Sequence, residues 1–215
     1  MKQAGKVIAA VFLLTCAGLA QDGRFQVSIS GIATISKSSS GNQVVLTPTL
    51  GGGVLLAGQV RIAPKFSLQA NFGHADNSQK YQTASLDYRL QSTLTEVSGA
   101  LVFRPFSTEN WKTFVFGGGG ILVFNPNLTT VISPNLSNPS SPIETVQNIG
   151  AVRQTQPVVL YGGGVDHPLP IFKFVSVRLQ YRGLFYNAPG FGVPVLFTGA
   201  RGHIAEPSIG LVVNF

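Results

Sequence analysis

Charged side chains are scarce in this sequence. Only 11% of its 215 residues are charged, whereas an ordinary soluble domain carries roughly a quarter. A soluble protein with so little charge would have difficulty covering its surface, while the 15 phenylalanines and 44% hydrophobic residues exclude an intrinsically disordered chain. We therefore expect something other than water to solvate part of the molecule.

Long hydrophobic runs and cysteines are scarce as well. Beyond the first twenty residues no apolar stretch reaches about 18 residues, which excludes membrane-spanning helices. The single cysteine, Cys16, lies within those first twenty residues, so a chain that loses them has neither disulfide nor thiol chemistry. No residues have metal-ligand spacing, and the basic residues form no run, so we expect no metal, no cofactor and no nucleic-acid partner.

The first twenty residues have the pattern of a signal peptide. A segment with two lysines precedes a short apolar core at 7–14, and a small residue follows two positions before Ala20. The pattern predicts cleavage after Ala20 and a mature domain over 21–215. Acylation of Cys16 is the alternative, although Thr15 is a poor residue before a lipidated cysteine.

The rest of the chain alternates between apolar and polar residues with a period of two. The clearest case is 65–73, where four apolar residues, Phe66, Leu68, Ala70 and Phe72, oppose Ser67, Gln69 and Asn71. Eight such segments occur: 24–36, 51–62, 65–73, 92–104, 113–124, 157–166, 173–186 and 208–215. Segments of this kind are the signature of transmembrane β-strands. In 113–124 and 157–166 both phases are apolar, so the facing of these two segments stays open.

Connections between the segments alternate strictly in length. Short ones, such as "APK" and "PFSTENW", separate four long ones at 37–50, 74–91, 125–156 and 187–204. Outer-membrane barrels have short turns at one end and long loops at the other. The sequence therefore predicts an all-β fold, a closed antiparallel transmembrane β-barrel with eight strands. Ten strands are the alternative if the loop at 125–156 contains a hairpin.

Glycine runs interrupt three of the predicted strands, at 51–53, 117–120 and 162–164. The interior of an eight-strand barrel has room only for side chains. We expect these glycines to relieve crowding on the inner face and to let the strands coil sharply.

The last strand carries a specific resemblance. Its residues Ile209, Leu211, Val213 and Phe215 resemble the C-terminal assembly signal of outer-membrane barrels. With the signal peptide and the loop pattern, the chain over about 24–215 resembles the small bacterial outer-membrane barrels typified by the OmpA membrane domain. "YGGGVD" and "VRLQYRGLFYNAPGF" are also similar to single-domain, porin-like barrels of Gram-negative bacteria.

This resemblance implies a location and a set of partners. The location is the bacterial outer membrane. The partners are membrane lipid, lipopolysaccharide and, through the last strand, the barrel-assembly machinery, with the protein itself a monomer.

Candidate functional residues are the charges on the polar phase of the strands. We predict a polar network in the lumen made of Arg61, Glu96, Arg178, Arg182, Gln59 and Gln180. Because an unpaired charge in a narrow lumen is costly, we expect Glu96 to pair with at least one arginine, with Gln69 and Asn71 adding hydrogen bonds. Such a network either closes the barrel as a plug or gates a passage for small solutes, and the sequence leaves open whether the lumen conducts.

An enzymatic role has only weak support. His74, Asp76 and His203 fall near the predicted loop ends, but no motif places a serine beside either histidine. We therefore predict a non-enzymatic outer-membrane barrel with a structural or surface role and exposed loops. A narrow passive pore is the alternative, and a lipid-modifying hydrolase is the distant one.

Overall fold

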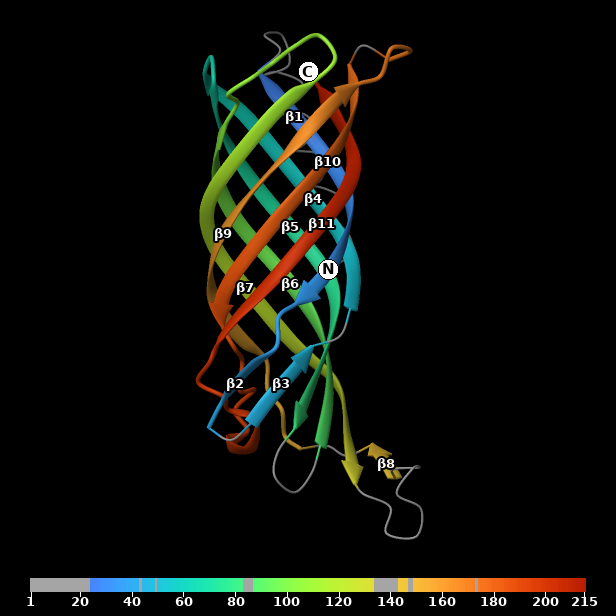
Figure 1. The fold of residues 1–215 in the computed structure, drawn as a ribbon, viewed down its shortest axis with the longest axis vertical. Coiled ribbons are helices and arrows are strands. Elements are labelled where there is room, and N and C mark those ends of the chain that lie inside the picture. The colour runs from blue at the N-terminus through green and yellow to red at the C-terminus, as the bar shows by residue number, and fades with distance from the viewer. Residues whose placement is uncertain are drawn as a thin grey trace, which may run out of the picture.

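The barrel is closed by eight antiparallel strands (Figure 1). The computed structural model describes residues 24–42, 44–48, 50–82, 87–133, 143–146, 149–172 and 174–215; the predicted signal peptide, its cleavage site and Cys16 lie outside them. The barrel strands are β1 (Phe25–Ser36), β4 (Leu50–Ala63), β5 (Phe66–Gln82), β6 (Asp87–Phe103), β7 (Lys112–Ser133), β9 (Gln154–Pro168), β10 (Val175–Asn187) and β11 (Arg201–Asn214).

The strand order confirms the predicted count. Each strand pairs with the next, in the order β1, β4, β5, β6, β7, β9, β10 and β11, and β11 pairs back to β1 with Leu211 opposite Ile29. The ten-strand alternative is wrong, because β9 pairs directly with β7 from Lys112 opposite Asp166 to Phe124 opposite Gln154. Among the described residues no helix is long and apolar enough to cross a membrane.

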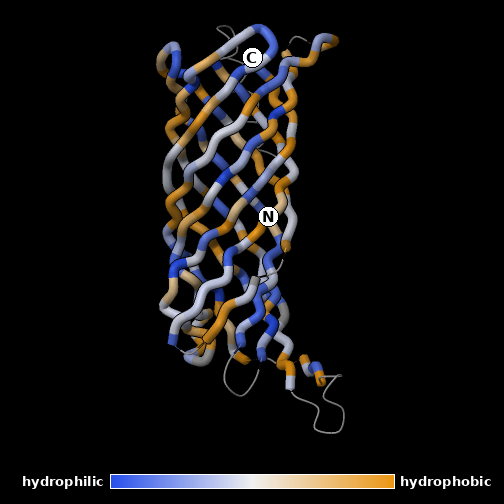
Figure 2. The backbone as a smooth tube through the Cα atoms, in the orientation of Figure 1, coloured by the Kyte–Doolittle hydropathy of each residue, from blue (hydrophilic) through white to orange (hydrophobic). Residues whose placement is uncertain are grey.

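The barrel has its polar residues inside and its apolar residues outside. Along β5, Gln69 and Asn71 are each 4% exposed, whereas Leu68 and Phe72 are 50% and 48% exposed. Hydrophilic and hydrophobic residues alternate along the strands in Figure 2. Burying polar groups while exposing large apolar ones is unfavourable in water, so this arrangement fits a lipid surround. It is the arrangement that the alternation predicted.

The facing of the two ambiguous strands is settled by their neighbours. Phe114, Phe116, Leu122 and Phe124 of β7 point inward, as do Val158 and Leu160 of β9. The register places Phe114 opposite Gly164 and Phe116 opposite Gly162.

The glycines of β9 make room for these two rings. A Cβ added to Gly162 would lie 2.6 Å from Cζ of Phe116, and one added to Gly164 would lie 2.7 Å from Cζ of Phe114. Both distances are too short for carbon atoms in van der Waals contact. In β9, therefore, glycine relieves crowding on the inner face, as expected.

The long connections contain more regular structure than predicted. β5 and β6 stay paired as far as Gln82 opposite Asp87, so most of the predicted loop at 74–91 is strand. The other additions are β2 (Ser39–Gly41) and β3 (Val44–Pro48), β8 (Ile143–Val146) beside β7, and the 3-10 helix η2 (Pro194–Leu196).

In these strand extensions the inward residues stay buried, but the outward residues change from apolar to polar. Along β5, Ala75, Asn77, Gln79 and Tyr81 remain buried, while the outward residues from His74 onward are polar. The backbone pairing continues although the outer surroundings change from apolar to polar. A pattern search for apolar outer residues therefore ends the strand too early.

Figure 1 places the long connections at the end of the barrel opposite the C-terminus. We call this end the loop end. The opposite end, with the turns at 64–65, 104–111 and 169–172, is the turn end.

Candidate functional site: the barrel interior

The interior has a polar half toward the turn end and an apolar half toward the loop end. The polar half contains six buried or nearly buried charged side chains in two ion-pair networks. The mouth network consists of Arg104, Asp166 and Arg178, and the central network consists of Glu96, Arg182 and Glu206. The two networks together contain three arginines and three carboxylates, so their formal charges balance. Each arginine is within ion-pair distance of a carboxylate.

Asp166 of β9 is the centre of the mouth network. Nε of Arg178 donates to Oδ1 of Asp166 at 2.7 Å, and Nη2 donates to Oδ2 at 2.9 Å. This two-point geometry is the strongest form of arginine–carboxylate contact. Arg178 also lies over the ring of Phe114, with Cζ 4.6 Å from the ring centroid, so the guanidinium is held by a carboxylate at its edge and by a ring on one face.

Arg104 extends the mouth network across the lumen. It follows β6 in the turn to β7, and its Nη2 donates to Oε1 of Gln26 at 2.7 Å and lies 3.7 Å from Oδ2 of Asp166. Burial lowers the pKa of Arg104, Asp166 raises it, and the neighbouring Arg178 and Arg61 lower it further. Several positive charges thus crowd the turn end.

Arg182 of β10 is the centre of the central network. Its side chain is fully buried, its Nη2 contacts Oε2 of Glu96, and its Nε lies 3.1 Å from Oε2 of Glu206. Ser98 donates to Oε1 of Glu96 at 2.5 Å, and Asn71 donates to Ser98 at 3.0 Å. The network therefore joins β5, β6, β10 and β11 across the lumen.

The apolar half fills the lumen toward the loop end. Its members are inward side chains of five strands and two residues between β10 and β11, namely Leu94, Leu122, Phe124, Leu160, Leu184, Tyr186, Ile204, Phe191 and Leu196. Phe191 packs edge-on against Phe124, with ring centroids 6.3 Å apart. The Tyr81 hydroxyl donates to the carbonyl of Pro189 at 3.1 Å, which ties the segment after β10 to the extension of β5. Burial raises the pKa of Tyr81 far above its ordinary value.

Two solved structures share this architecture. Neisserial surface protein A (NspA) matches with a TM-score of 0.50 at 16% identity, over 90% of this chain and 98% of NspA. OprG from Pseudomonas aeruginosa, an outer membrane protein, also matches with a TM-score of 0.50, at 14% identity over 89% of this chain and 96% of OprG. The fold is that of a small outer-membrane β-barrel. No protein-family model and no curated protein matches the sequence of this outer-membrane-type barrel.

The structure brings together several of the predicted lumen residues of this small barrel. Glu96 and Arg182 are in contact, Arg178 lies two inward positions nearer the turn end on β10, and Gln59 accepts from Arg104 at 3.3 Å. Gln180 is buried between the two arginines on β10, and its carbonyl accepts from Ser208 at 3.3 Å.

Arg61 does not belong to either network of the barrel. It is exposed at the turn end, beside a register shift between Arg61 and Ala63 that ends the regular pairing of β4 with β5. It makes no ion pair with any residue that the structure describes. The two-residue period correctly placed it in phase with Gln59 but could not show that the strand leaves the closed part of the lumen there.

Three charged members of the networks were missed by sequence reasoning. Asp166 ends the segment whose facing was ambiguous, Arg104 is the last residue of a predicted strand, and Glu206 lies two residues before one. A signal for Glu206 existed, because it has the same phase as the inward residue Ser208. Extending each strand by one period at both ends would have found it.

The two candidate histidines, His74 and His203, lie on different parts of the barrel wall. Nδ1 of His74 is 3.3 Å from Oγ1 of Thr95, and Nε2 of His203 is 3.2 Å from the hydroxyl of Tyr161. His74 is on β5 and His203 on β11, with β4 and β1 between them in the sheet. Neither histidine has a serine as its hydrogen-bond partner within the described chain, so the weak hydrolase constellation gains no support.

Proposed function

We propose that the chain is an integral, non-enzymatic barrel of a bacterial outer membrane, with a structural or surface role carried by its loop end. The observation that carries the proposal is the inversion of the ordinary burial pattern around a filled lumen. Residues such as Leu68, Phe72 and Leu179 are about half exposed on the wall, while the interior is occupied by ion pairs and by apolar side chains. Such a wall is stable in lipid, and such an interior leaves the outer ends of the strands as the part available for contacts.

The proposed partners follow from the same surfaces. The apolar wall would contact membrane lipid, and its outer end would meet lipopolysaccharide. Ile209 and Leu211 are exposed on the outer face of β11, and Phe215 is exposed directly after its end, where the barrel-assembly machinery could bind them during insertion. The wall closes within one chain, which supports a monomer.

Cell fractionation with heat-modifiable gel mobility tests the location and the fold. We expect the protein in the outer-membrane fraction, with a faster-migrating band in unheated samples that shifts on boiling. Recovery in a soluble fraction without such a shift would contradict the proposal.

A narrow passive pore is the second candidate, and the ion-pair networks favour it specifically. Charged side chains that line a lumen can exchange their partners for a passing ion, which would allow conduction. A lumen filled only by apolar side chains cannot conduct ions. Planar-bilayer recording separates the two: we expect no channel steps from the wild type, because the apolar half stays closed. Defined steps from the wild type that change amplitude in Glu96→Ala would favour the pore, and silence from both proteins would remove it.

A further inference from the structure

The turn end opens into a cavity whose positive side chains, apart from Arg104, lie outside the two ion-pair networks of the lumen. The cavity has a volume of about 570 Å³ and is lined by residues from β1, β4, β5, β7, β11 and two turns. Small-molecule sites commonly have volumes of about 300–1,000 Å³. The size alone therefore admits a small ligand.

Four of the lining side chains are cationic: Arg61, Lys65, Arg104 and Lys112. None of the lining residues is acidic. Arg61, Lys65 and Lys112 make no ion pair within the part of the chain that the structure describes, and Arg104 is 3.7 Å from Asp166, a carboxylate that Arg178 already engages at two points. The positive charge of the cavity is thus largely uncompensated.

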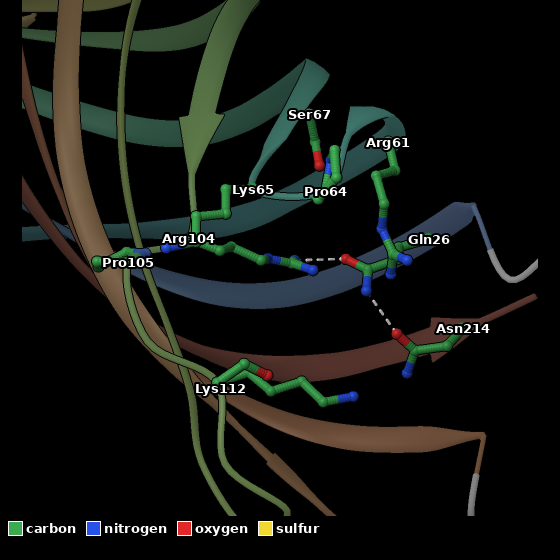
Figure 3. Close-up of a pocket in the computed structure, with 10 residues that line it drawn as sticks. Gln26, Arg61, Pro64, Lys65, Ser67, Arg104, Pro105, Lys112 and Asn214 are labelled. Carbon is green, nitrogen blue, oxygen red and sulfur yellow. Dashed lines mark hydrogen bonds between the residues drawn. The ribbon is translucent and has the colours of Figure 1, made fainter.

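The cations approach one volume from different sides. Figure 3 shows Arg61, Arg104 and Lys112 reaching from three directions toward the space beside Gln26 and Asn214. Gln26 accepts from Arg104 and donates to Oδ1 of Asn214 at 2.6 Å, so both amides are held in place. The lowering of the Arg104 pKa by Arg61 agrees with two positive charges facing the same space.

Positive charges that line one cavity repel one another, and an anion bound between them would offset that repulsion. Phosphate groups supply the most negative charge in a small volume, about −1.5 to −2 each near neutral pH, and match the planar donor fork of arginine. Of the ten residues that line the cavity, Pro64 and Pro105 are the two apolar ones, and the other eight offer charged or polar groups to a ligand. The side-chain amides of Gln26 and Asn214 form the floor of the cavity, and this floor faces the lumen, not the outer wall. Its position favours an anion that arrives from water over a lipid headgroup.

We propose that the cavity at the turn end binds a small soluble polyanion carrying more than one phosphate group. Arg61, Lys65 and Lys112 contact the phosphates from the rim, Arg104 contacts them from the wall, and Gln26 and Asn214 form the floor. The site is separate from the central network and from the loop end, so it stands whether or not the barrel conducts.

Calorimetric titration of inorganic tripolyphosphate into the refolded mature protein in neutral detergent tests the site. We expect one saturable site that weakens as salt is raised, because the contacts are electrostatic. Removing one charge-assisted contact should weaken binding about tenfold, so Arg61→Gln and Lys112→Gln should each raise Kd by about that factor. Heat-modifiable mobility verifies that each variant is folded, and the exposed Arg61→Gln alone suffices if Lys112→Gln does not fold.

Lys37→Gln is the matched control, since it removes one exposed positive charge at the loop end. Its Kd should stay within about twofold of the wild type if the contacts are local. Absence of saturable binding, or an equal loss in Lys37→Gln, would overturn the proposal. A third arm of the experiment compares nanodiscs with and without phosphatidylglycerol. If Arg61→Gln and Lys112→Gln change the association with this anionic lipid while tripolyphosphate does not bind, the cavity is a site for a lipid headgroup. The proposal of a soluble polyanion would then be wrong.

Discussion

Arg182 lies in the middle of the lumen with no solvent exposure, between Glu96 and Glu206, whose side chains are 4% and 2% exposed. Replacing it by methionine in Arg182→Met keeps a long side chain but leaves two carboxylates buried without their cation. Breaking a buried ion pair by removing one partner costs about 3–5 kcal/mol. We expect Arg182→Met to lower the free energy of unfolding by that amount or to prevent refolding.

A partly exposed ion pair elsewhere in the chain gives the comparison. Lys80 and Asp87 lie 3.0 Å apart in the extended part of β5 and β6, with side-chain exposures of 31% and 28%. Pairs that keep contact with solvent contribute about 0–1 kcal/mol. Lys80→Met should therefore change stability by less than about 1 kcal/mol.

Urea unfolding in detergent micelles, followed by fluorescence of the single tryptophan, Trp111, measures both variants. A rescue variant separates lost charge from lost packing. Combining Arg182→Met with Glu96→Gln and Glu206→Gln removes all three charges, and an uncharged triad of similar volume should recover most of the stability. The reasoning would be refuted if Arg182→Met cost no more than Lys80→Met. A triple variant that fails to recover would attribute the loss to packing.

Two further predictions concern the wall. Leu56→Arg places a charge on the outer face beside Ile29, within the apolar band, and should destabilise the barrel in lipid vesicles by about 2–4 kcal/mol. His74→Arg places the same charge on the polar extension of β5 and should cost about 0–1 kcal/mol. Urea titrations of vesicle-folded protein measure both variants, and equal costs would contradict a lipid-facing wall. Gly162→Ala should lower stability by roughly 1–3 kcal/mol because the added methyl meets Phe116 and the carbonyl of Tyr181, and Phe116→Leu in the same chain should restore part of it; an unchanged urea midpoint for Gly162→Ala would show that the wall yields there.

The cationic cavity and the filled lumen together describe a barrel with two different ends. The turn end is open and positively charged, and the loop end is closed by Phe191, Leu196 and the apolar side chains beneath them. A solute entering at the turn end meets the mouth network first and the apolar half last. For this reason we expect binding, not passage, at the turn end.

Sequence alone was sufficient for the class of fold. Alternation along strands such as 65–73 and the sorting of connections by length predicted an eight-strand barrel with apolar residues outside. These features are local, since every outward side chain meets the same lipid whichever strand lies beside it. The prediction failed where the outer surroundings changed: at His74 the outward residues become polar, although β5 continues to Gln82.

The contents of the lumen were decided by tertiary structure. Inward side chains meet partners from across the barrel, so their environment depends on closure and register and not on neighbours in sequence. Glu96 pairs with Arg182, 86 positions away, and the inward ring of Phe116 fits because Gly162 opposite it has no side chain. The apolar half and the exposure of Arg61 at the mouth were therefore invisible to a period of two, because the same alternation is compatible with any set of neighbours inside the closed wall.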